Sequence, residues 1–318
     1  MPSLRDELQT LSTQATAAGV FIGTSSWKYP GWIGQIYEEQ RYITRGKFST
    51  SRFERDCLKE YAEVFSTVCV DAAYYKFPDV DYLTKLAKQV KPGFRFSFKV
   101  TDDITIKRFT NLPRFGKRAG MANEHFLDAD LFIACFLRPC EAIRDYVGLI
   151  MFEFSHFHGS DFSRGREFME ALDSFFSRLP KGWNYGVEIR NRNFLHPDYF
   201  AMLASHGVTH IFNSWGDMPG VEEQWEMPGS LTRPDCVGAR LLLKPGRKYQ
   251  EAVDAFSPYE SIKEPVPAAR TTAAKMILRN QQAGTPKQTL IYVNNRLEGN
   301  ALQTIQAILT EARRPKDG

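Results

Sequence analysis

Short apolar segments recur along the whole chain, and each is followed by a longer segment with helical spacing. The apolar segments are VFIGTSSW (20–27), TVCVDAAY (67–74), RFSFKVT (95–101), GLIMFEF (148–154), YGVEIRN (185–191), THIFNSW (209–215), VGARLLL (237–243) and TLIYVNN (289–295). Helix candidates between them include 79–90, 123–145, 164–178, 269–283 and 298–312, and Asp79, Asn123 and Ser163 are the expected N-caps. Alternating strands and helices predict parallel strands joined by helical crossovers.

The number of strand–helix units favours a closed barrel over an open sheet. About eight units in 318 residues, with no evident linker, predict an α/β fold with one (β/α)8 TIM-like barrel domain. An open doubly wound sheet would normally carry GxGxxG after its first strand, and GTSSWKYPGW lacks that spacing. We expect an N-terminal extension over 1–19, the barrel over 20–312 and a short tail over 313–318.

Composition excludes several classes of protein. The excess of 41 Lys and Arg over 37 Asp and Glu is too small to require a nucleic-acid partner. The 5 cysteines are scattered without a CxxC pair, so neither a disulfide framework nor a zinc ribbon is expected. The polar start argues against a signal peptide, and no apolar run is long enough to cross a membrane. We expect a cytoplasmic protein, and no motif identifies a cofactor or an oligomeric state.

Charged residues sit late in several of the predicted strands. They are Asp71, Lys99, Glu153, Glu188, Arg190, Arg240 and Lys244. The outer face of barrel strands packs against helices, so these side chains are expected to point inward and to meet at the end where the strands finish. Asn294 shares a strand face with Tyr292 at the same end. The alternative is a ring of structural salt bridges above the barrel core.

The stretch GTSSWKYPGWIGQIYEEQ (23–40) places aromatic residues in a segment too irregular for a helix or a strand. It follows the first strand, so Trp27, Tyr29 and Trp32 are predicted to wall the pocket at the functional end of the barrel, where flat rings suit sugars or bases. A satellite cluster of aromatic rings packed beneath the loop is the competing interpretation for Trp32.

Several chemistries fit these residues. The favoured hypothesis is a pocket for a small anionic ligand, similar to a sugar or a nucleotide, held by Lys99, Arg190, Arg240, Lys244 and Arg247. Glu188 is the first candidate for a general base or an orienting carboxylate, and Asp71 and Glu153 follow it. A glycosidase-like pair formed by Glu153 and Glu188 is a weaker alternative, because Arg190 would lower the pKa of its neighbour.

Two further alternatives rest on local clusters. Basic residues after the third strand, in IKRFTNLPRFGKRAG (106–120), could bind nucleic acid in a non-catalytic barrel. His156, His158 and Asp161 in SHFHGSD are weak candidates for a metal-dependent hydrolase, and no metal site is otherwise predicted.

Four motifs in order along the chain carry a family resemblance. IGTSSWKYPGW, FSFKVTDDITIKRF, GVEIRNRNFLHPDYF and IYVNNRLEGNALQTI together resemble the YecE-like family, known as domain of unknown function 72. The resemblance implies a TIM-barrel-like fold and no established reaction. The positions it points to are Gly23, Thr24, Trp27, Tyr29, Trp32, Tyr75, Lys99, Glu188, Arg190, Asn294 and Asn295.

The chain departs from the family pattern at three places. After the second strand it reads VDAAYY, with Asp71 where the family has Glu and Ala73 where it has Asn. FEFSHFH replaces a Gln-Leu-Pro, and the arginine-rich motif of the seventh strand is reduced to ARLLLKPGRKY. These differences indicate a divergent branch whose ligand differs from that of the main family.

Overall fold

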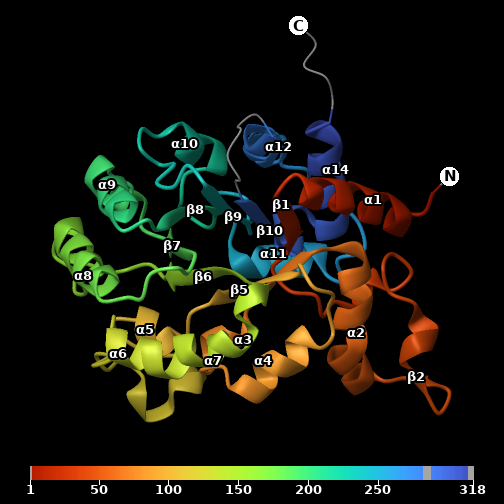
Figure 1. The fold of residues 1–318 in the computed structure, drawn as a ribbon, viewed down its shortest axis with the longest axis horizontal. Helices are drawn as coiled ribbons and strands as arrows, with labels where there is room; N and C mark the ends of the chain where they lie inside the picture. The colour runs from red at the N-terminus through yellow and green to blue at the C-terminus, as the bar shows by residue number, and fades with distance from the viewer. Residues whose placement is uncertain (1, 282–287, 314–318) are drawn as a thin grey trace, which may run out of the picture.

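Eight parallel strands close into a barrel in the computed structural model, which describes residues 2–281 and 288–313 (Figure 1). In chain order the strands are β1 (Val20–Thr24), β4 (Thr67–Val70), β5 (Arg95–Lys99), β6 (Val147–Phe154), β7 (Tyr185–Ile189), β8 (Thr209–Ser214), β9 (Cys236–Leu241) and β10 (Gln288–Val293). Strand β1 closes the ring by pairing with both β4 and β10. The predicted barrel is therefore confirmed, and each predicted strand is present.

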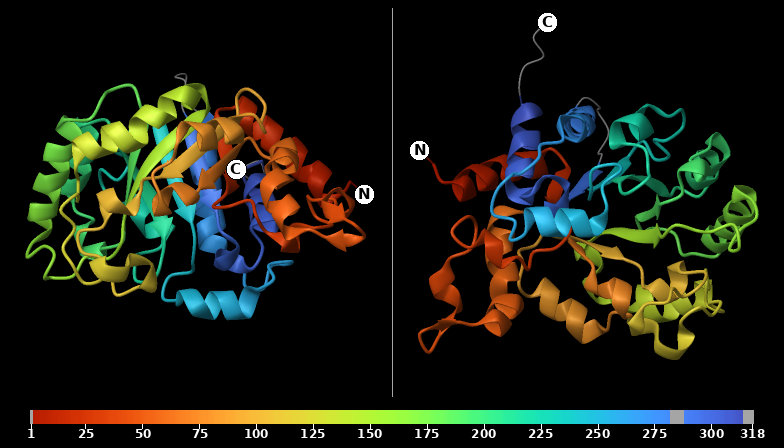
Figure 2. Two further views of the ribbon diagram at one scale, coloured as in Figure 1. Left: turned by 90° about the horizontal axis from the view of Figure 1, so that it is seen from below. Right: turned by 180° about the vertical axis from the view of Figure 1, so that it is seen from behind.

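Helices surround the barrel, as two further views show (Figure 2). They are α1 (Leu4–Ala17), α2 (Thr50–Val64), α3 (Ala72–Tyr75), α4 (Val80–Ala87), α5 (Asp102–Thr105), α6 (Ala129–Phe132), α7 (Arg138–Cys140), α8 (Gly165–Ser177), α9 (Pro197–Ser205), α10 (Val221–Glu226), α11 (Tyr249–Phe256), α12 (Pro267–Gln281), α13 (Asn295–Glu298) and α14 (Ala301–Glu311). A two-stranded hairpin, β2 (Ile43–Thr44) and β3 (Lys47–Phe48), lies between β1 and α2. None of the helices described has the length and apolar composition that crossing a membrane requires.

The predicted helix over 123–145 is the main difference among the helices. The helical path begins only at α6 and then runs through a π-helical turn, α7 and a 3-10 segment. Asn123 does not cap it, because its Oδ1 accepts from the backbone of His125 at 3.1 Å, before the helix begins. Its Nδ2 donates to the carbonyls of Asp103 and Ile106, each at 2.7 Å, which ties it into the preceding loop. Asp128 caps the helix instead, whereas Asp79 caps α4 as predicted.

The predicted cap at Ser163 is also wrong. The N-cap of α8 is Arg164, which makes no side-chain capping bond. Ser163 lies one residue earlier, and its hydroxyl donates to Glu167 in the first turn. The end of the predicted helix over 269–283 lies outside the described residues.

Residues before the first strand also form structure. Helix α1 buries Leu8, Leu11 and Ala15, and it lies beside α2, α14 and β1 (Figure 1). Of the expected tail over 313–318, only residue 313 lies within the described part of the chain.

The barrel interior changes from apolar to charged along the strands. Every second strand residue points inward, so Leu149, Met151 and Glu153 stack one above another on β6, as do Leu290 and Tyr292 on β10. Leu149, Met151, Leu290 and Tyr292 belong to an inner cluster that is separate from the main core between strands and helices. Charged side chains therefore lie at the carboxyl ends of the strands, above an apolar inner cluster. The candidate functional site is expected at this end of the barrel.

Candidate functional site

A cavity of about 600 Å³ lies at the end of the barrel where the strands finish. Its wall includes a residue at or just beyond the end of seven strands, namely Asp71, Lys99, Glu153, Arg190, Trp215, Arg240 and Asn294. The view from below shows α11 at the same end as the arrowheads of the strands (Figure 2). The charged strand residues thus meet at one end of the barrel.

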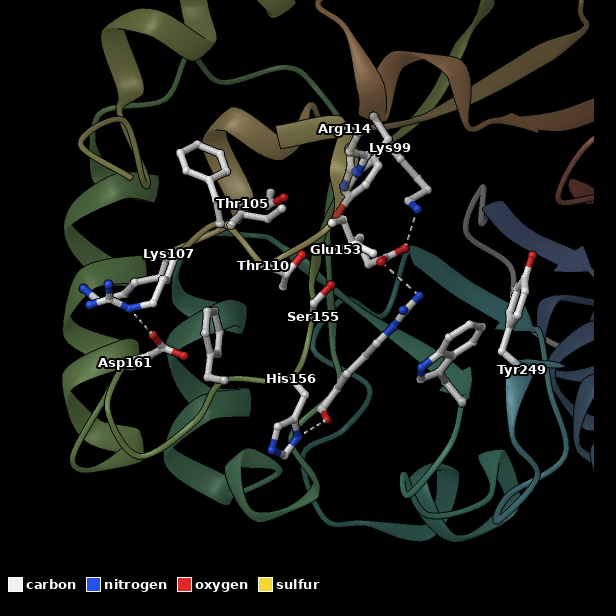
Figure 3. A pocket seen from close by; sticks show the side chains of 18 of the residues that line it. Lys99, Thr105, Lys107, Thr110, Arg114, Glu153, Ser155, His156, Asp161 and Tyr249 are labelled. Carbon is white, nitrogen blue, oxygen red and sulfur yellow. Dashed lines mark hydrogen bonds and ion pairs between the residues drawn. The ribbon is translucent and has the colours of Figure 1, made fainter. Parts of the chain in front are cut away.

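Glu153 lies at the centre of an ion-pair network beneath this cavity (Figure 3). Its Oε2 accepts from Nζ of Lys99 at 2.7 Å and from Nη1 of Arg240 at 2.9 Å, and its Oε1 lies 3.0 Å from Nη2 of Arg190. Glu188 accepts from Nη1 of Arg240 at 2.6 Å and from Nη2 of Arg190 at 3.1 Å. Three cations therefore hold two buried carboxylates.

Strand register explains why these cations are needed. Glu153 and Glu188 are register partners on β6 and β7, so their charges would repel each other inside the barrel. Arg240 reaches them from β9, and its Nη1 contacts one oxygen of each carboxylate. One guanidinium thereby relieves the repulsion.

The network fixes the protonation of its members. Burial alone would raise the pKa of Glu153, but Arg190, Lys99 and Arg240 outweigh it and hold that pKa well below its ordinary value. Burial alone would lower the pKa of Lys99, but Glu153 and Asp71 raise it above its ordinary value. These groups stay ionised at neutral pH, so Glu153 is a poor proton acceptor.

The position of Glu188 argues against its predicted role as a base. Its side chain is 0% exposed, it does not line the cavity, and one oxygen binds Arg190 while the other binds Arg240. No face of the carboxylate reaches a ligand, so Glu188 positions the two arginines.

Asp71 is the carboxylate of this group that reaches solvent. Its side chain is 38% exposed, and its Oδ1 lies 3.6 Å from Nη2 of Arg240 and 4.0 Å from Nζ of Lys99. Both separations exceed hydrogen-bond length, so Asp71 is held only loosely.

The aromatic loop after β1 does not form the pocket wall, which corrects the prediction for Trp27, Tyr29 and Trp32. Trp27 and Trp32 are buried in the main core, and none of the three lines the cavity. The ring of Tyr29 lies 4.8 Å from that of Trp32 and 5.8 Å from that of Tyr259, and burial raises its pKa to about 12. Rings this large bury more apolar surface beneath a loop than at an open rim, so the satellite-cluster interpretation describes them better.

Three other predicted ligand contacts also lie away from the cavity wall. Lys244 and Arg247 both pair with Glu264, the former at 2.6 Å. Asn295 is 1% exposed, and its Oδ1 accepts from the backbone of Ala301 at 2.8 Å. Local pairing and helix packing, rather than a ligand, account for their positions. Tyr75 does line the cavity and is exposed.

The two histidines and Asp161 line the cavity without forming a metal centre. The described residues contain no group of three or more His, Cys, Asp or Glu side chains placed to hold a metal ion. The ring of His156 approaches the carbonyl of Arg190 at 3.3 Å, and Asp161 accepts from the backbone of His158 at 2.9 Å. The donor set therefore gives the metal-dependent alternative no support.

Aromatic side chains do contribute to the wall, but from positions that the sequence analysis did not single out. The guanidinium of Arg190 lies 4.0 Å from the ring centre of Trp215, and the Trp215 ring lies 6.2 Å from that of Tyr249. The guanidinium of Arg296 lies 4.5 Å from the ring centre of Tyr249. On another part of the wall, Nζ of Lys99 lies 4.0 Å from the ring of Tyr74. Trp215 and Tyr74 end predicted strand segments, which was the available signal for them.

The cavity wall carries a marked excess of positive charge. It includes the cations Lys99, Lys107, Arg108, Arg114, Arg190, Arg240 and Arg296, against the carboxylates Asp71, Glu153 and Asp161. Within residues 2–281 and 288–313, Lys107 and Arg296 have no carboxylate within 4.0 Å. Figure 3 shows Lys107 on one side of Glu153 and Tyr249, which Arg296 contacts, on the other.

Fold and site together define a (β/α)8 barrel protein with a positively charged cavity at the carboxyl ends of its strands. The chain belongs to the family described as protein of unknown function DUF72, whose model matches residues 21–317.

Similarity to individual proteins agrees with this family membership. The chain is 25% identical over 182 residues to the UPF0759 protein YecE of Escherichia coli K12, covering 57% of this chain and 50% of that one. It thus spans about half the length of the curated relatives it matches. DUF72 family proteins of known structure share the fold: one from Enterococcus faecalis V583 (TM-score 0.61, 16% identity, 94% of this chain and 97% of that one) and one from Thermotoga maritima MSB8 (TM-score 0.59, 17% identity, 93% and 99%).

Proposed function

We propose that the cavity binds a small anionic ligand with a sugar or base ring. The observation that carries the proposal is the positive charge of a cavity of about 600 Å³, whose wall holds seven Lys and Arg. They outnumber the three carboxylates of the wall together with Glu188 and Asp102, which pair with wall arginines from behind it. That volume suits a ligand of this size. Cations in a partly enclosed, low-dielectric site attract anions more strongly than they would in water.

Acid–base chemistry in this cavity would fall to Asp71. Glu153 is locked by three cations, and Glu188 is sealed beneath two of them. A glycosidase-like pair formed by these two glutamates is therefore disfavoured, because both charges are already neutralised. Asp71 combines exposure with a place in the wall, so a hydrolase or lyase reaction would use it as the proton-exchanging group.

The nucleic-acid alternative has weaker support. Two arginines of the basic loop are paired locally, Arg114 with Asp102 and Arg118 with Asp103. Fewer loop cations are then available to contact phosphates. Oligonucleotide binding that falls steeply with salt would favour this alternative over a small ligand.

The proposal is tested by comparing charged and neutral versions of the same ligand. Isothermal titration calorimetry would measure glucose 6-phosphate against glucose, and adenosine monophosphate against adenosine, at low and at moderate salt. We expect the phosphorylated member of at least one pair to bind, its neutral partner to bind much more weakly, and the affinity to fall with salt. Equal binding of both members, or of neither in each pair, refutes the proposal.

A variant lacking the two unpaired cations provides the second measurement. Lys107→Gln combined with Arg296→Gln should weaken binding by about tenfold or more, because a charge-assisted contact contributes about 1.5–3 kcal/mol. Arg166→Gln is the matched control, since Arg166 lies on α8 and its side chain is 81% exposed. An equal loss of affinity in the double variant and in Arg166→Gln would contradict a specific role for the cavity.

A further inference from the structure

We propose that the β9–β10 side of the cavity is a phosphate-binding subsite formed by Arg240, Asn294 and Arg296. This inference rests on the proposed function. It goes further by naming the place where the anionic group of the ligand binds and by identifying that group as a phosphate. Its basis is a set of hydrogen-bond donors that the protein itself leaves without acceptors.

Asn294 contributes an amide donor at the cavity wall. The residue is 4% exposed and lines the cavity just beyond β10. Its Oδ1 accepts from the backbone nitrogen of Arg296 at 3.0 Å, which fixes the orientation of the amide. Among the described residues, Nδ2 has no acceptor. Nδ2 is not among the fully enclosed atoms of the described residues, so it can donate to an anion in the cavity.

Arg240 supplies a second donor, Nη2, and its Nε is enclosed by the protein. Nη1 is occupied by Glu153 and Glu188, but Nε has no partner in the described part of the chain, and Nη2 lies 3.6 Å from its nearest acid, Asp71. Residue 240 is 2% exposed and lines the cavity. Its position is rigid because two carboxylates hold the same guanidinium.

Arg296 completes the set from α13, the short helix that follows β10. Within 2–281 and 288–313 it has no carboxylate within 4.0 Å, and its buried Nε has no hydrogen-bond partner. The ring of Tyr249, from α11, holds the guanidinium at 4.5 Å. A cation stacked on a ring keeps its N–H edge available for an anion.

Backbone pairing places these residues next to one another. Arg240 is the register partner of Tyr292, and the backbone nitrogen of Asn294 donates to the carbonyl of Leu241 at 2.8 Å. These are the seventh and eighth strands of the barrel, and in many β/α barrels the loops after those strands hold a phosphate. That analogy agrees with the donors but does not carry the inference.

Phosphate fits this donor set better than a carboxylate does. The three side chains come from β9, from the residue just beyond β10 and from α13, which suits the several terminal oxygens of a phosphate monoester. A carboxylate, by contrast, is satisfied by one planar fork. Asp71 lines the same wall, with its Oδ1 3.6 Å from Nη2 of Arg240, so it would repel the incoming anion. The subsite is therefore expected to bind phosphate more tightly once Asp71 loses its charge.

The experiment uses the full chain and titrates inorganic phosphate by isothermal titration calorimetry, with acetate as the second probe. Asn294→Asp keeps the oxygen that accepts from residue 296 but replaces the donor with a repelling charge. We expect it to weaken phosphate binding at least tenfold. Arg296→Met should cause a loss of similar size, and Asp71→Asn should tighten binding about threefold or more. Thermal unfolding of each variant checks that it is folded. If Asn294→Asp does not fold, Arg296→Met provides the test.

The outcomes separate this inference from the broader proposal. If Lys107→Gln weakens phosphate binding as much as Asn294→Asp does, or if acetate binds as tightly as phosphate, the subsite is wrong while an anion-binding cavity stands. If no phosphorylated ligand binds the wild-type chain, both proposals fail.

Discussion

Replacing Glu153 by Gln tests whether the charge network supports the barrel. The substitution keeps the shape of the side chain but removes the charge that three cations share at 2.7, 2.9 and 3.0 Å. Glu153 lines the cavity but is only 3% exposed, so little water can replace the lost partner. Removing one member of a buried ion pair costs about 3–5 kcal/mol, and we expect a loss of unfolding free energy in that range.

Urea unfolding followed by circular dichroism gives the measurement, and Glu170→Gln is the matched control. Glu170 pairs with Arg166 at 3.0 Å on the surface of α8, where its side chain is 66% exposed, so the control should lose less than about 1 kcal/mol. Combining Glu153→Gln with Lys99→Met should cost less than the sum of the single changes, because the second change removes a cation that has lost its partner. A loss below about 1 kcal/mol for Glu153→Gln would refute the view that the network is a buried, mutually dependent unit.

The same carboxylate predicts a pH dependence. The folded pKa of Glu153 lies below its ordinary value of 4.5, so its stabilisation is complete above that pH and is lost as the pH falls toward the folded pKa. The stability difference between wild type and Glu153→Gln should therefore shrink as the pH is lowered below about 4.5. A difference that grows on acidification would contradict the assigned sign.

Further predictions concern the core. His210 is buried against aromatic rings, and burial lowers its pKa to about 3 from 6.5, so its contribution to stability is lost as the pH falls through that window. Between pH 7 and 4, unfolding measurements should show His210→Phe gaining about 3 kcal/mol relative to wild type, and parallel pH profiles would contradict this. Trp32→Ala should destabilise the protein by about 3–5 kcal/mol because the ring is 0% exposed. Trp215→Ala should instead weaken ligand binding with a smaller loss of stability, and the reverse ranking would restore the aromatic loop after β1 as the pocket wall.

Strand pattern predicted more of this protein than helix pattern did. Each barrel strand carries a strong apolar signal because it is buried on both faces. Helix α2 was predicted only without bounds, as a helical segment between the first two strands, although it buries Phe53, Leu58 and Tyr61 on one face. The segment over 123–145 has helical spacing, yet Asn123 is drawn into the preceding loop by two carbonyl oxygens, a contact that local sequence does not specify.

The candidate site, too, was predicted only in part from the sequence. Alternation along strands correctly placed Lys99, Glu153 and Arg240 inside the barrel near its open end. It could not show that Glu188 is enclosed by Arg190 and Arg240, because that depends on which strands face one another across the barrel. Register and curvature, rather than spacing, decide such contacts.

The amino-acid sequence by itself determined the barrel and the convergence of strand-borne charges, because a side chain on a two-face-buried strand has only two directions to point. The tertiary structure alone decided which charges neutralise each other and which residues wall the cavity. Trp215, Tyr249 and Arg296 reach that wall from loops after different strands, while the aromatic residues after β1 pack beneath their own loop. Loop paths are set by contacts between segments far apart in the chain, and no local pattern encodes those contacts.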